Sequence, residues 1–256
     1  MNGQKKPHVL ILGGSKGLGW GCVEKFCREG YPVLAIHRDR RSDLDGITAK
    51  ATALQANGTA LEMYQMDAFK AASRESFIQG LPDTVKESGI GVIVFSIARG
   101  NLGKMDSLSS ADLRITSEAM AFVLQDWVVA LLEAGCLASD CRIIAFTSEG
   151  SSRVMPGYGP VAVAKAALEA MIRQMAVELA PRGIRANCVQ AGVTDTESLR
   201  MIPGAEKLME YAKKRNPNKR LTLPEDVANA TYLLSLPEAA WITGNVIAVD
   251  GGESLS

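Results

Sequence analysis

Residues 10–21, LILGGSKGLGWG, give the strongest local indication of the fold of this chain. In this stretch an apolar run is followed directly by closely spaced glycines. Gly13, Gly17 and Gly19 stand in a G-x-x-x-G-x-G spacing. Glycines directly after a strand permit a tight turn and let the backbone approach a pyrophosphate, which then rests on the N-terminus of the following helix. A glycine cluster alone is weak evidence, since a structural turn uses the same residues. Its meaning therefore depends on the rest of the chain.

Strand-like and helix-like patterns alternate along the whole sequence. Most strand candidates are nearly continuous hydrophobics, as expected for parallel strands that are covered on both faces. They lie at residues 8–12, 32–38, 61–67, 91–97, 141–148, 185–192 and 245–251. This alternation predicts right-handed βαβ units. We expect an α/β, doubly wound Rossmann-type fold with a seven-stranded parallel sheet flanked by helices on both faces, as a single domain over residues 1–256. In that context the glycines predict a nucleotide-binding turn.

Composition argues against several classes of protein. The chain carries 28 basic and 28 acidic residues, and this balance argues against bulk binding to nucleic acid or to a membrane surface. The first apolar stretch reads as a strand and not as a signal peptide, and no apolar run approaches the roughly 18 residues of a membrane span. The five cysteines form no C-x-x-C, which favours reduced thiols in a cytoplasmic protein. Two isolated histidines, His8 and His37, cannot build a usual zinc or Ser-His-Asp site, so we expect no metal.

Two predicted helices, 118–132 and 161–179, are apolar around most of their circumference. A helix that covers one face of a sheet needs only one apolar stripe, so such helices must be buried on a second side as well. We interpret them as a subunit interface of a homotetramer or dimer. The alternative is that both helices are buried entirely within their own chain.

The end of the second predicted strand, AIHRDRR, bears on the choice of nicotinamide coenzyme. An acidic residue there hydrogen-bonds the 2′-hydroxyl of the adenosine ribose, whereas arginine accommodates a 2′-phosphate. Arg38, together with Lys16 from the glycine turn, favours the phosphate and therefore NADPH. Asp39 or Asp43 could instead bind a plain ribose, which leaves NADH as the alternative. Asp67, at the end of the third predicted strand, is expected to reach the adenine edge.

The stretch YGPVAVAK, residues 158–165, sets a tyrosine and a lysine seven positions apart at the start of a predicted helix. Seven residues are two helical turns, about 10.5 Å along the axis, so both side chains fall on nearly the same face. Pro160 suits the first turn of a helix and leaves Tyr158 on the preceding loop.

The glycine spacing, the Tyr/Lys helix and the closing DGG at 250–252 together resemble the short-chain dehydrogenase/reductase family over essentially the whole chain. Most members use Tyr-x3-Lys, a serine about 13 residues before the tyrosine, and an asparagine in the preceding long helix. Here Val161 occupies the tyrosine position of Tyr-x3-Lys, Ala145 stands 13 residues before Tyr158, where the serine is expected relative to that tyrosine, and the region 116–122 contains no asparagine.

These departures resemble the enoyl-acyl-carrier-protein reductases of that family, whose signature is Tyr-x6-Lys, and most of all the FabL type. SIA at 96–98 is similar to their replacement for the Asn-Asn-Ala-Gly element, Ala191 replaces a usual proline, and Ser148 stands ten positions before Tyr158, as a serine does in the FabL type. The resemblance implies Tyr158, Lys165 and Ser148 as catalytic residues.

The resemblance also implies an activity, the NADPH-dependent reduction of the 2,3 double bond of an enoyl thioester in fatty-acid synthesis or a related pathway. In that reaction charge develops on the thioester oxygen, three bonds from the carbon that receives the hydride, so the hydrogen-bond donor must stand further from the coenzyme than in ketone reduction. Two alternatives remain: a carbonyl-reducing enzyme of the same family, acting on a 3-ketoacyl thioester or another ketone, and a catalytically silent NADPH-binding sensor.

The implied contacts extend over much of the chain. The coenzyme contacts are Gly13, Ser15, Lys16, Gly17, Leu18, Gly19, Arg38, Asp67, Ala68, Ser96, Ile97, Ala98, Lys165, Gly192, Val193 and Thr196. The substrate contacts are Tyr158, Met155, Leu199 and Met201. Residues 197–220 would form a mobile substrate-binding lid, and their excess of basic side chains either steers an acidic acyl carrier protein or is a solvated helix face.

Overall fold

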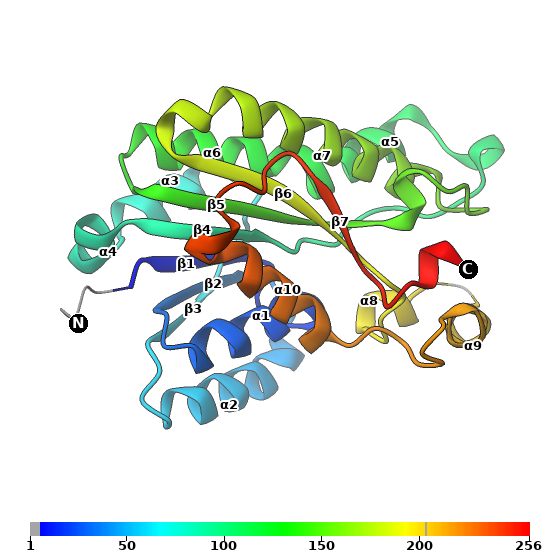
Figure 1. The fold of residues 1–256 in the computed structure, drawn as a ribbon, viewed down its shortest axis with the longest axis horizontal. Helices are drawn as coiled ribbons and strands as arrows, with labels where there is room; N and C mark the ends of the chain where they lie inside the picture. Colours follow the sequence, from blue (N-terminus) through cyan, green and yellow to red (C-terminus); the bar gives the residue numbers. More distant parts are fainter. Residues whose placement is uncertain (1–5, 203) are drawn as a thin grey trace.

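Seven parallel strands form one sheet in the computed structural model, which describes residues 6–202 and 204–256 (Figure 1). The strand order is β3-β2-β1-β4-β5-β6-β7, and every neighbouring pair is parallel. The strands are β1 (His8–Leu12), β2 (Val33–His37), β3 (Leu61–Gln65), β4 (Ile90–Phe95), β5 (Leu137–Ser148), β6 (Ile184–Ala191) and β7 (Val246–Val249). The predicted doubly wound α/β fold and all seven strands are confirmed. β5 begins earlier than predicted, at Leu137.

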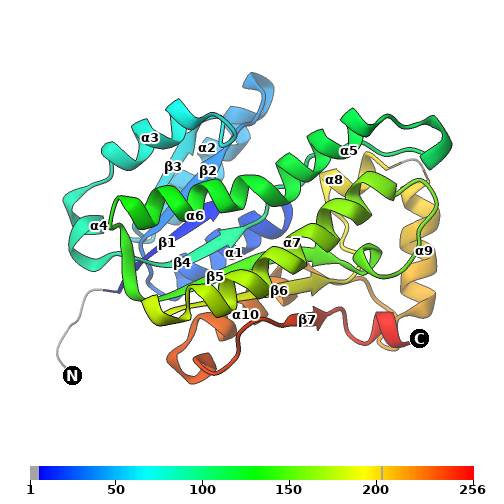
Figure 2. The ribbon, with the colours of Figure 1, turned by 90° about the horizontal axis from the view of Figure 1, so that it is seen from above.

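Helices cover both faces of the sheet (Figure 1). One face carries α1 (Gly17–Arg28), α2 (Leu44–Gln55) and α10 (Pro224–Ser235). The other carries α3 (Ala71–Gln79), α5 (Ser110–Ser117), α6 (Val123–Glu133) and α7 (Gly159–Glu178), with α4 (Asp83–Ser88) leading into β4. Two short helices, α8 (Glu197–Arg200) and α9 (Ala205–Arg215), lie near the C-terminus, beyond the carboxyl end of the sheet (Figure 2).

The core lies in two layers, one on each face of the sheet. In β1, Leu10 and Leu12 belong to the cluster beneath α6 and α7, whereas Val9 and Ile11 belong to the cluster beneath α1 and α10. This division follows from the period of two in a strand, which sends successive side chains to opposite faces. All four side chains are completely buried, and each contributes about 1.5–3 kcal/mol relative to an exposed position.

The second half of the sheet is covered by one long helical run, residues 110–133, which the sequence predicted only from 118 onward. A single π turn, Glu118–Phe122, joins α5 to α6. The run has the length and mean hydropathy, 1.4, of a membrane span. It packs on the sheet instead, with Trp127 fully buried and its indole N–H donating to the Ala68 carbonyl at 3.0 Å. It is therefore a core helix of this fold.

The outer sides of α6 and α7 remain apolar and accessible. The two helices run side by side over the sheet (Figure 2), with a groove of about 280 Å³ between them. Phe122, Val129 and Val163 are 44%, 38% and 47% exposed. The alternative that both helices are buried entirely within their own chain is therefore wrong, because their apolar residues are more numerous than the sheet can cover.

Candidate active site

The glycine turn forms at the carboxyl ends of β1 and β4 and requires glycine. Gly13 and Gly17 have φ angles of +92° and +52°, which side chains disfavour. A Cβ on Gly19 would lie 2.0 Å from the Gly13 carbonyl oxygen, and one on Gly13 would lie 2.9 Å from the Ser96 carbonyl oxygen. The predicted elements Gly13–Gly19 and 96–98 therefore meet here, as the coenzyme prediction requires.

A coenzyme pyrophosphate would fit this turn. The N-terminus of α1 has no acidic residue in its first turn, and Lys16 at its N-cap forms no side-chain capping bond. An uncapped helix N-terminus carries partial positive charge and backbone donors, both of which favour an anion. Thr196 closes the turn from the β6 side, with its Cγ2 atom 3.2 Å from the place of a Cβ on Gly17.

The two cations predicted to bind a 2′-phosphate are both ion-paired. Lys16 lies 2.7 Å from carboxylate oxygens of Asp43 and Glu197 and 3.3 Å from Asp39. The hydrogen bonds that Lys16 donates to these acids, that to Asp43 first, raise the pKa of Lys16 and keep it charged. Arg38 donates to Asp67 at 2.7 Å, so the residue predicted to hold phosphate and the residue predicted to reach adenine lie together.

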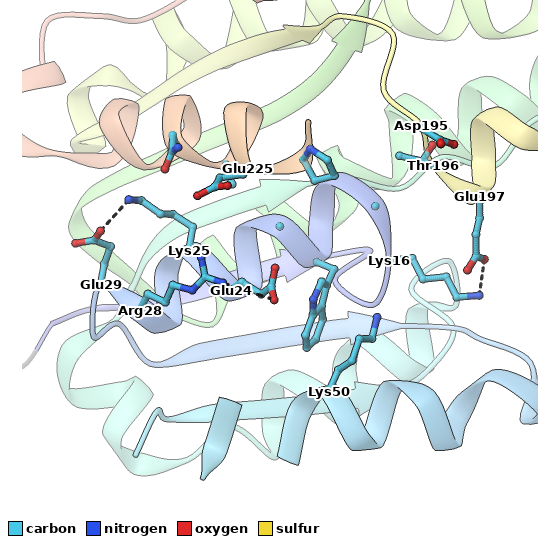
Figure 3. A pocket seen from close by; sticks show the side chains of 16 residues that line it. Lys16, Glu24, Lys25, Arg28, Glu29, Lys50, Asp195, Thr196, Glu197 and Glu225 are labelled. Atoms are coloured by element: carbon cyan, nitrogen blue, oxygen red, sulfur yellow. Dashed lines mark hydrogen bonds and ion pairs between the residues drawn. The ribbon is translucent and has the colours of Figure 1, made fainter. Parts of the chain in front are cut away.

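A pocket of about 420 Å³ opens beside this turn, between α1 and α10. Lys16 and Glu197 close one end of it (Figure 3). On the α2 side Lys50 lies 4.4 Å from the ring centroid of Trp20 and donates to the Ser15 carbonyl at 3.1 Å. The contact to Ser15 ties α2 to the glycine turn.

Tyr158 stands at the N-cap of α7, as predicted, and its hydroxyl meets Ser148. Their oxygens are 3.3 Å apart. The Tyr158 ring rests on Gly150, where a Cβ would lie 2.5 Å from the ring and 2.6 Å from the Met155 methyl group. Burial raises the pKa of Tyr158, and the Ser148 hydrogen bond offsets this only in part. The phenol therefore keeps its proton at neutral pH and can donate a hydrogen bond.

Lys165 lies two turns further along α7 and is buried. Its ammonium group donates to the Phe146 carbonyl at 2.7 Å, while Ser148, two residues on along β5, faces Tyr158. Burial lowers the pKa of Lys165 to about 8, although Cys188 and Glu169 act in the opposite direction. Thus the end of β5 supports both candidate catalytic groups, and Lys165 is still largely charged at pH 7.

Three predicted coenzyme contacts, Gly192, Val193 and Thr196, make hydrogen bonds or close contacts within the protein. The Val193 N–H donates to a carboxylate oxygen of Glu253 at 3.2 Å, and the Val193 carbonyl accepts from Thr222 at 3.1 Å. The Thr196 hydroxyl oxygen caps α8 by accepting from the Leu199 N–H at 3.2 Å. Gly192 is enclosed, because a Cβ there would lie 2.4 Å from the Thr222 hydroxyl.

The predicted lid, residues 197–220, comprises α8 and α9, but its carboxyl end is anchored. Asn216 is buried and donates to the Asp250 carbonyl at 2.8 Å. If these residues form a lid, as predicted, it would therefore end at α9 rather than extend to residue 220. Met201 is 81% exposed and Leu199 is half-buried, so their contact with substrate stays a prediction.

The π turn is the feature of the site that sequence reasoning missed. Its Ala119 and Met120 pack with Val161 and Ala164 of α7 and against the Tyr158 ring. Single π turns inside α-helices are rare and occur often at functional sites. No local signal marks this one, because the residues involved are ordinary helix formers and only packing against α7 distinguishes the turn.

Known reductases and dehydrogenases are similar to this chain in sequence and in fold. A family model described as enoyl-(acyl carrier protein) reductase matches residues 13–254. An enoyl-[acyl-carrier-protein] reductase [NADH] of Rhizobium meliloti is 26% identical over 100% of this chain and 93% of its own. A 2-(S)-hydroxypropyl-CoM dehydrogenase of Xanthobacter autotrophicus is 29% identical over 98% of both chains. A short-chain dehydrogenase/reductase of Serratia marcescens superposes with a TM-score of 0.81 at 27% identity, covering 97% of this chain and 98% of its own.

Proposed function

The chain belongs to the short-chain dehydrogenase/reductase family, and from this premise we propose that it reduces the 2,3 double bond of an enoyl thioester with NADPH. Membership in this family makes it an oxidoreductase, and the matching family model carries the enoyl-(acyl carrier protein) reductase description. Names of relatives do not decide the substrate, since they include both an enoyl reductase and a secondary-alcohol dehydrogenase.

The proposal rests chiefly on where a tyrosine hydroxyl lies relative to Lys165. In α7 and at its N-cap, the only tyrosine is Tyr158. Val161, four residues before Lys165, is buried in an apolar cluster and offers no hydroxyl. Tyr158 provides one about a turn further out, beside Ser148. A donor in that place suits charge that develops at a distance from the carbon receiving the hydride.

Conjugate reduction requires this separation. A bound nicotinamide coenzyme would supply the hydride, which adds to the β-carbon of the substrate. Negative charge then develops on the thioester oxygen, three bonds away. Tyr158 donates a hydrogen bond to that oxygen, and a preorganised donor in a dry site is among the strongest contributions to catalysis. Ser148 orients the Tyr158 hydroxyl, and the charge of Lys165 favours the anion.

A second candidate is carbonyl reduction within the same family. The Ser148–Tyr158 pair supports it, because two adjacent hydroxyls at 3.3 Å can polarise a ketone oxygen as well as a thioester oxygen. The secondary-alcohol dehydrogenase among the relatives supports it too.

The test offers both classes of substrate to one preparation. Oxidation of the reduced coenzyme is followed with crotonyl and 2-dodecenoyl thioesters, and with an acetoacetyl thioester as the control. Each acyl group is presented on coenzyme A and on an acyl carrier protein. Turnover of the enoyl substrates alone supports conjugate reduction. Turnover of the acetoacetyl substrate alone would replace the proposal by the carbonyl-reducing candidate.

The proposed preference for NADPH rests on Arg38. Its side chain is paired with Asp67 but is half exposed, so a phosphate group could reach it. A hydrogen bond to a charged group contributes about 1.5–3 kcal/mol, so Arg38→Ala should raise the KM for NADPH about 10- to 100-fold and leave the KM for NADH unchanged. Steady-state kinetics with both coenzymes measure this. Arg28→Ala, an exposed arginine at the other end of α1, is the control. An equal loss for both coenzymes would contradict the assignment, and the NADH named for the Rhizobium relative is the competing possibility.

An acidic carrier protein is the partner we propose for the acyl group. The arginines of the 197–220 segment are paired with acids: Arg200 with Asp195, Arg215 with Glu149, and Arg220 with Asp226. Its exposed lysines are Lys207, Lys213, Lys214 and Lys219. These lysines are exposed on the segment predicted to cover the substrate, and they would attract an acidic partner. Equal kcat/KM for carrier-bound and coenzyme A thioesters would contradict this.

A homotetramer or dimer assembled through α6 and α7 remains our proposal for the assembly. The exposed apolar side chains and the groove between these helices support it. A monomeric mass by light scattering would contradict it.

A further inference from the structure

A cluster of opposite charges joins helix α9 to the loop that follows β5. Arg215, the last residue of α9, has only 7% of its side chain exposed, and its Nη2 lies 2.6 Å from Oε1 of Glu149. Glu149 directly follows Ser148 in the chain. The ion pair therefore connects the lid segment to the first residue of the loop that leads to Tyr158.

A second arginine converges on the same carboxylate oxygen. Arg153 Nη1 lies 3.0 Å from Glu149 Oε1, and its Nη2 lies 3.5 Å from the hydroxyl oxygen of Tyr211, on α9. Burial would raise the pKa of Glu149, but the hydrogen bonds from Arg215 and Arg153 outweigh it and hold this pKa below its ordinary value. The carboxylate is therefore charged at neutral pH, and both arginines remain attracted to it.

The same end of α9 is fixed to the C-terminal turn. Arg215 Nε donates to the Glu253 carbonyl, and the Asn216 side chain donates to the Asp250 carbonyl. At the other end of α9, Glu206 and Lys207 are exposed. Arg215 thus lies at the end of α9 that these two hydrogen bonds hold to the C-terminal turn.

The loop on the other side of the ion pair supports the candidate catalytic tyrosine. The Tyr158 ring packs against Gly150, where an added Cβ would lie 2.5 Å from the ring and 2.6 Å from the Met155 methyl group. The Tyr158 N–H also donates to the Met155 carbonyl at 3.1 Å. A movement of Glu149 therefore displaces the support of Tyr158.

We infer that Glu149 is a positioning residue that latches helix α9, through Arg215, to the loop that supports Tyr158, so that the enclosure of the substrate and the alignment of its hydrogen-bond donor occur together. The inference rests on the proposed function for the identity of that substrate, an acyl thioester. The coupling between helix and loop does not depend on it.

The experiment compares Glu149→Gln, Arg215→Met and the double variant with the wild-type chain in two assays. The first measures the rate of tryptic cleavage after the exposed lysines of α9, which requires no turnover. The second measures KM and kcat for 2-dodecenoyl thioester and the dissociation constant of the coenzyme. Each single variant should cleave faster and should raise the KM for the thioester, because α9 encloses the substrate less well. Each should also lower kcat about tenfold, because a small misplacement of a reacting group has large effects on the rate. Coenzyme affinity should not change.

Two further variants separate a latch from a general loss of stability. Arg215→Lys keeps the charge and should restore part of the thioester KM. Arg220→Met breaks an exposed pair with Asp226 in the same segment and should change neither readout.

A latch also predicts that the double variant loses less than the sum of the two single losses, since both substitutions remove the Glu149–Arg215 pair and each removes only one further contact of its own. Additive effects, or unchanged cleavage in the single variants, would overturn the inference. Faster cleavage in a protein that turns over no thioester would leave the latch in place and reject the proposed function alone.

Discussion

Replacing Tyr158 by phenylalanine is expected to lower kcat for an enoyl thioester by about 10²–10³-fold, the usual effect of removing one preorganised donor from a developing oxyanion. The substitution removes the hydroxyl and leaves the ring on Gly150 and Met155. The fold loses a single hydrogen bond, to Ser148, worth about 0.5–1.5 kcal/mol. Steady-state kinetics at saturating coenzyme measure the loss, and thermal unfolding checks that the protein remains folded.

Three control measurements accompany the prediction for Tyr158→Phe. Tyr31→Phe removes a hydroxyl from a tyrosine packed against Phe26 and Tyr232, away from the site, and should leave kcat unchanged. Ser148→Ala should cost less than Tyr158→Phe, because Ser148 acts only through the tyrosine hydroxyl. Coenzyme affinity of Tyr158→Phe should match the wild type. A variant that keeps its rate would show that Tyr158 is not the donor, whichever thioester is reduced.

Lys165→Met is expected to lower kcat/KM by at least about 10²-fold and to weaken coenzyme binding about 10- to 100-fold, since it removes a buried cation and its hydrogen bonds. Methionine fills the space of the aliphatic stem. The wild-type protein should also lose activity as pH rises through about 8. This follows because burial lowers the pKa of Lys165 to that value and deprotonation removes the positive charge.

The pH profile of kcat/KM for the coenzyme is the measurement, because it reports ionisations of the free enzyme. The alkaline decline should disappear in Lys165→Met. It should move to lower pH in Glu169→Gln, since the Glu169 charge favours the protonated lysine. Tyr158→Phe should retain it, because burial raises the pKa of that phenol above its ordinary value. An unchanged decline in Lys165→Met would assign it to another group.

Local patterns were enough for the fold and for much of the site. Nearly continuous apolar runs predicted most of the strands, since a parallel strand buried on two faces has no polar alternation. The spacing of the glycines predicted the turn, since positions such as Gly19 tolerate no side chain: a Cβ there would collide with the backbone. Pro160 placed Tyr158 at the start of α7. Each of these signals lies within one element or one turn, where the sequence neighbours are also the spatial neighbours.

Contacts between distant segments could not be predicted in this way. Asp39 and Asp43 were possible ribose ligands in the sequence, but they surround Lys16, together with Glu197, the first residue of α8. The excess of basic residues in the predicted lid is also smaller in effect than the sequence suggests. Its arginines form ion pairs with acidic residues that lie outside α8 and α9. Charge counts along a segment do not reveal partners that only the fold brings near.

The sequence by itself determined the doubly wound sheet, the coenzyme turn and the spacing of Tyr158 and Lys165, because these depend on backbone conformation and helix period. Only the tertiary structure decided that a π turn supports Tyr158, that the lid is anchored at Asn216, and that Glu149 joins α9 to the catalytic loop. The physical reason is that these features are made by side chains far apart in the chain. Their energies depend on burial and distance, which no local pattern contains.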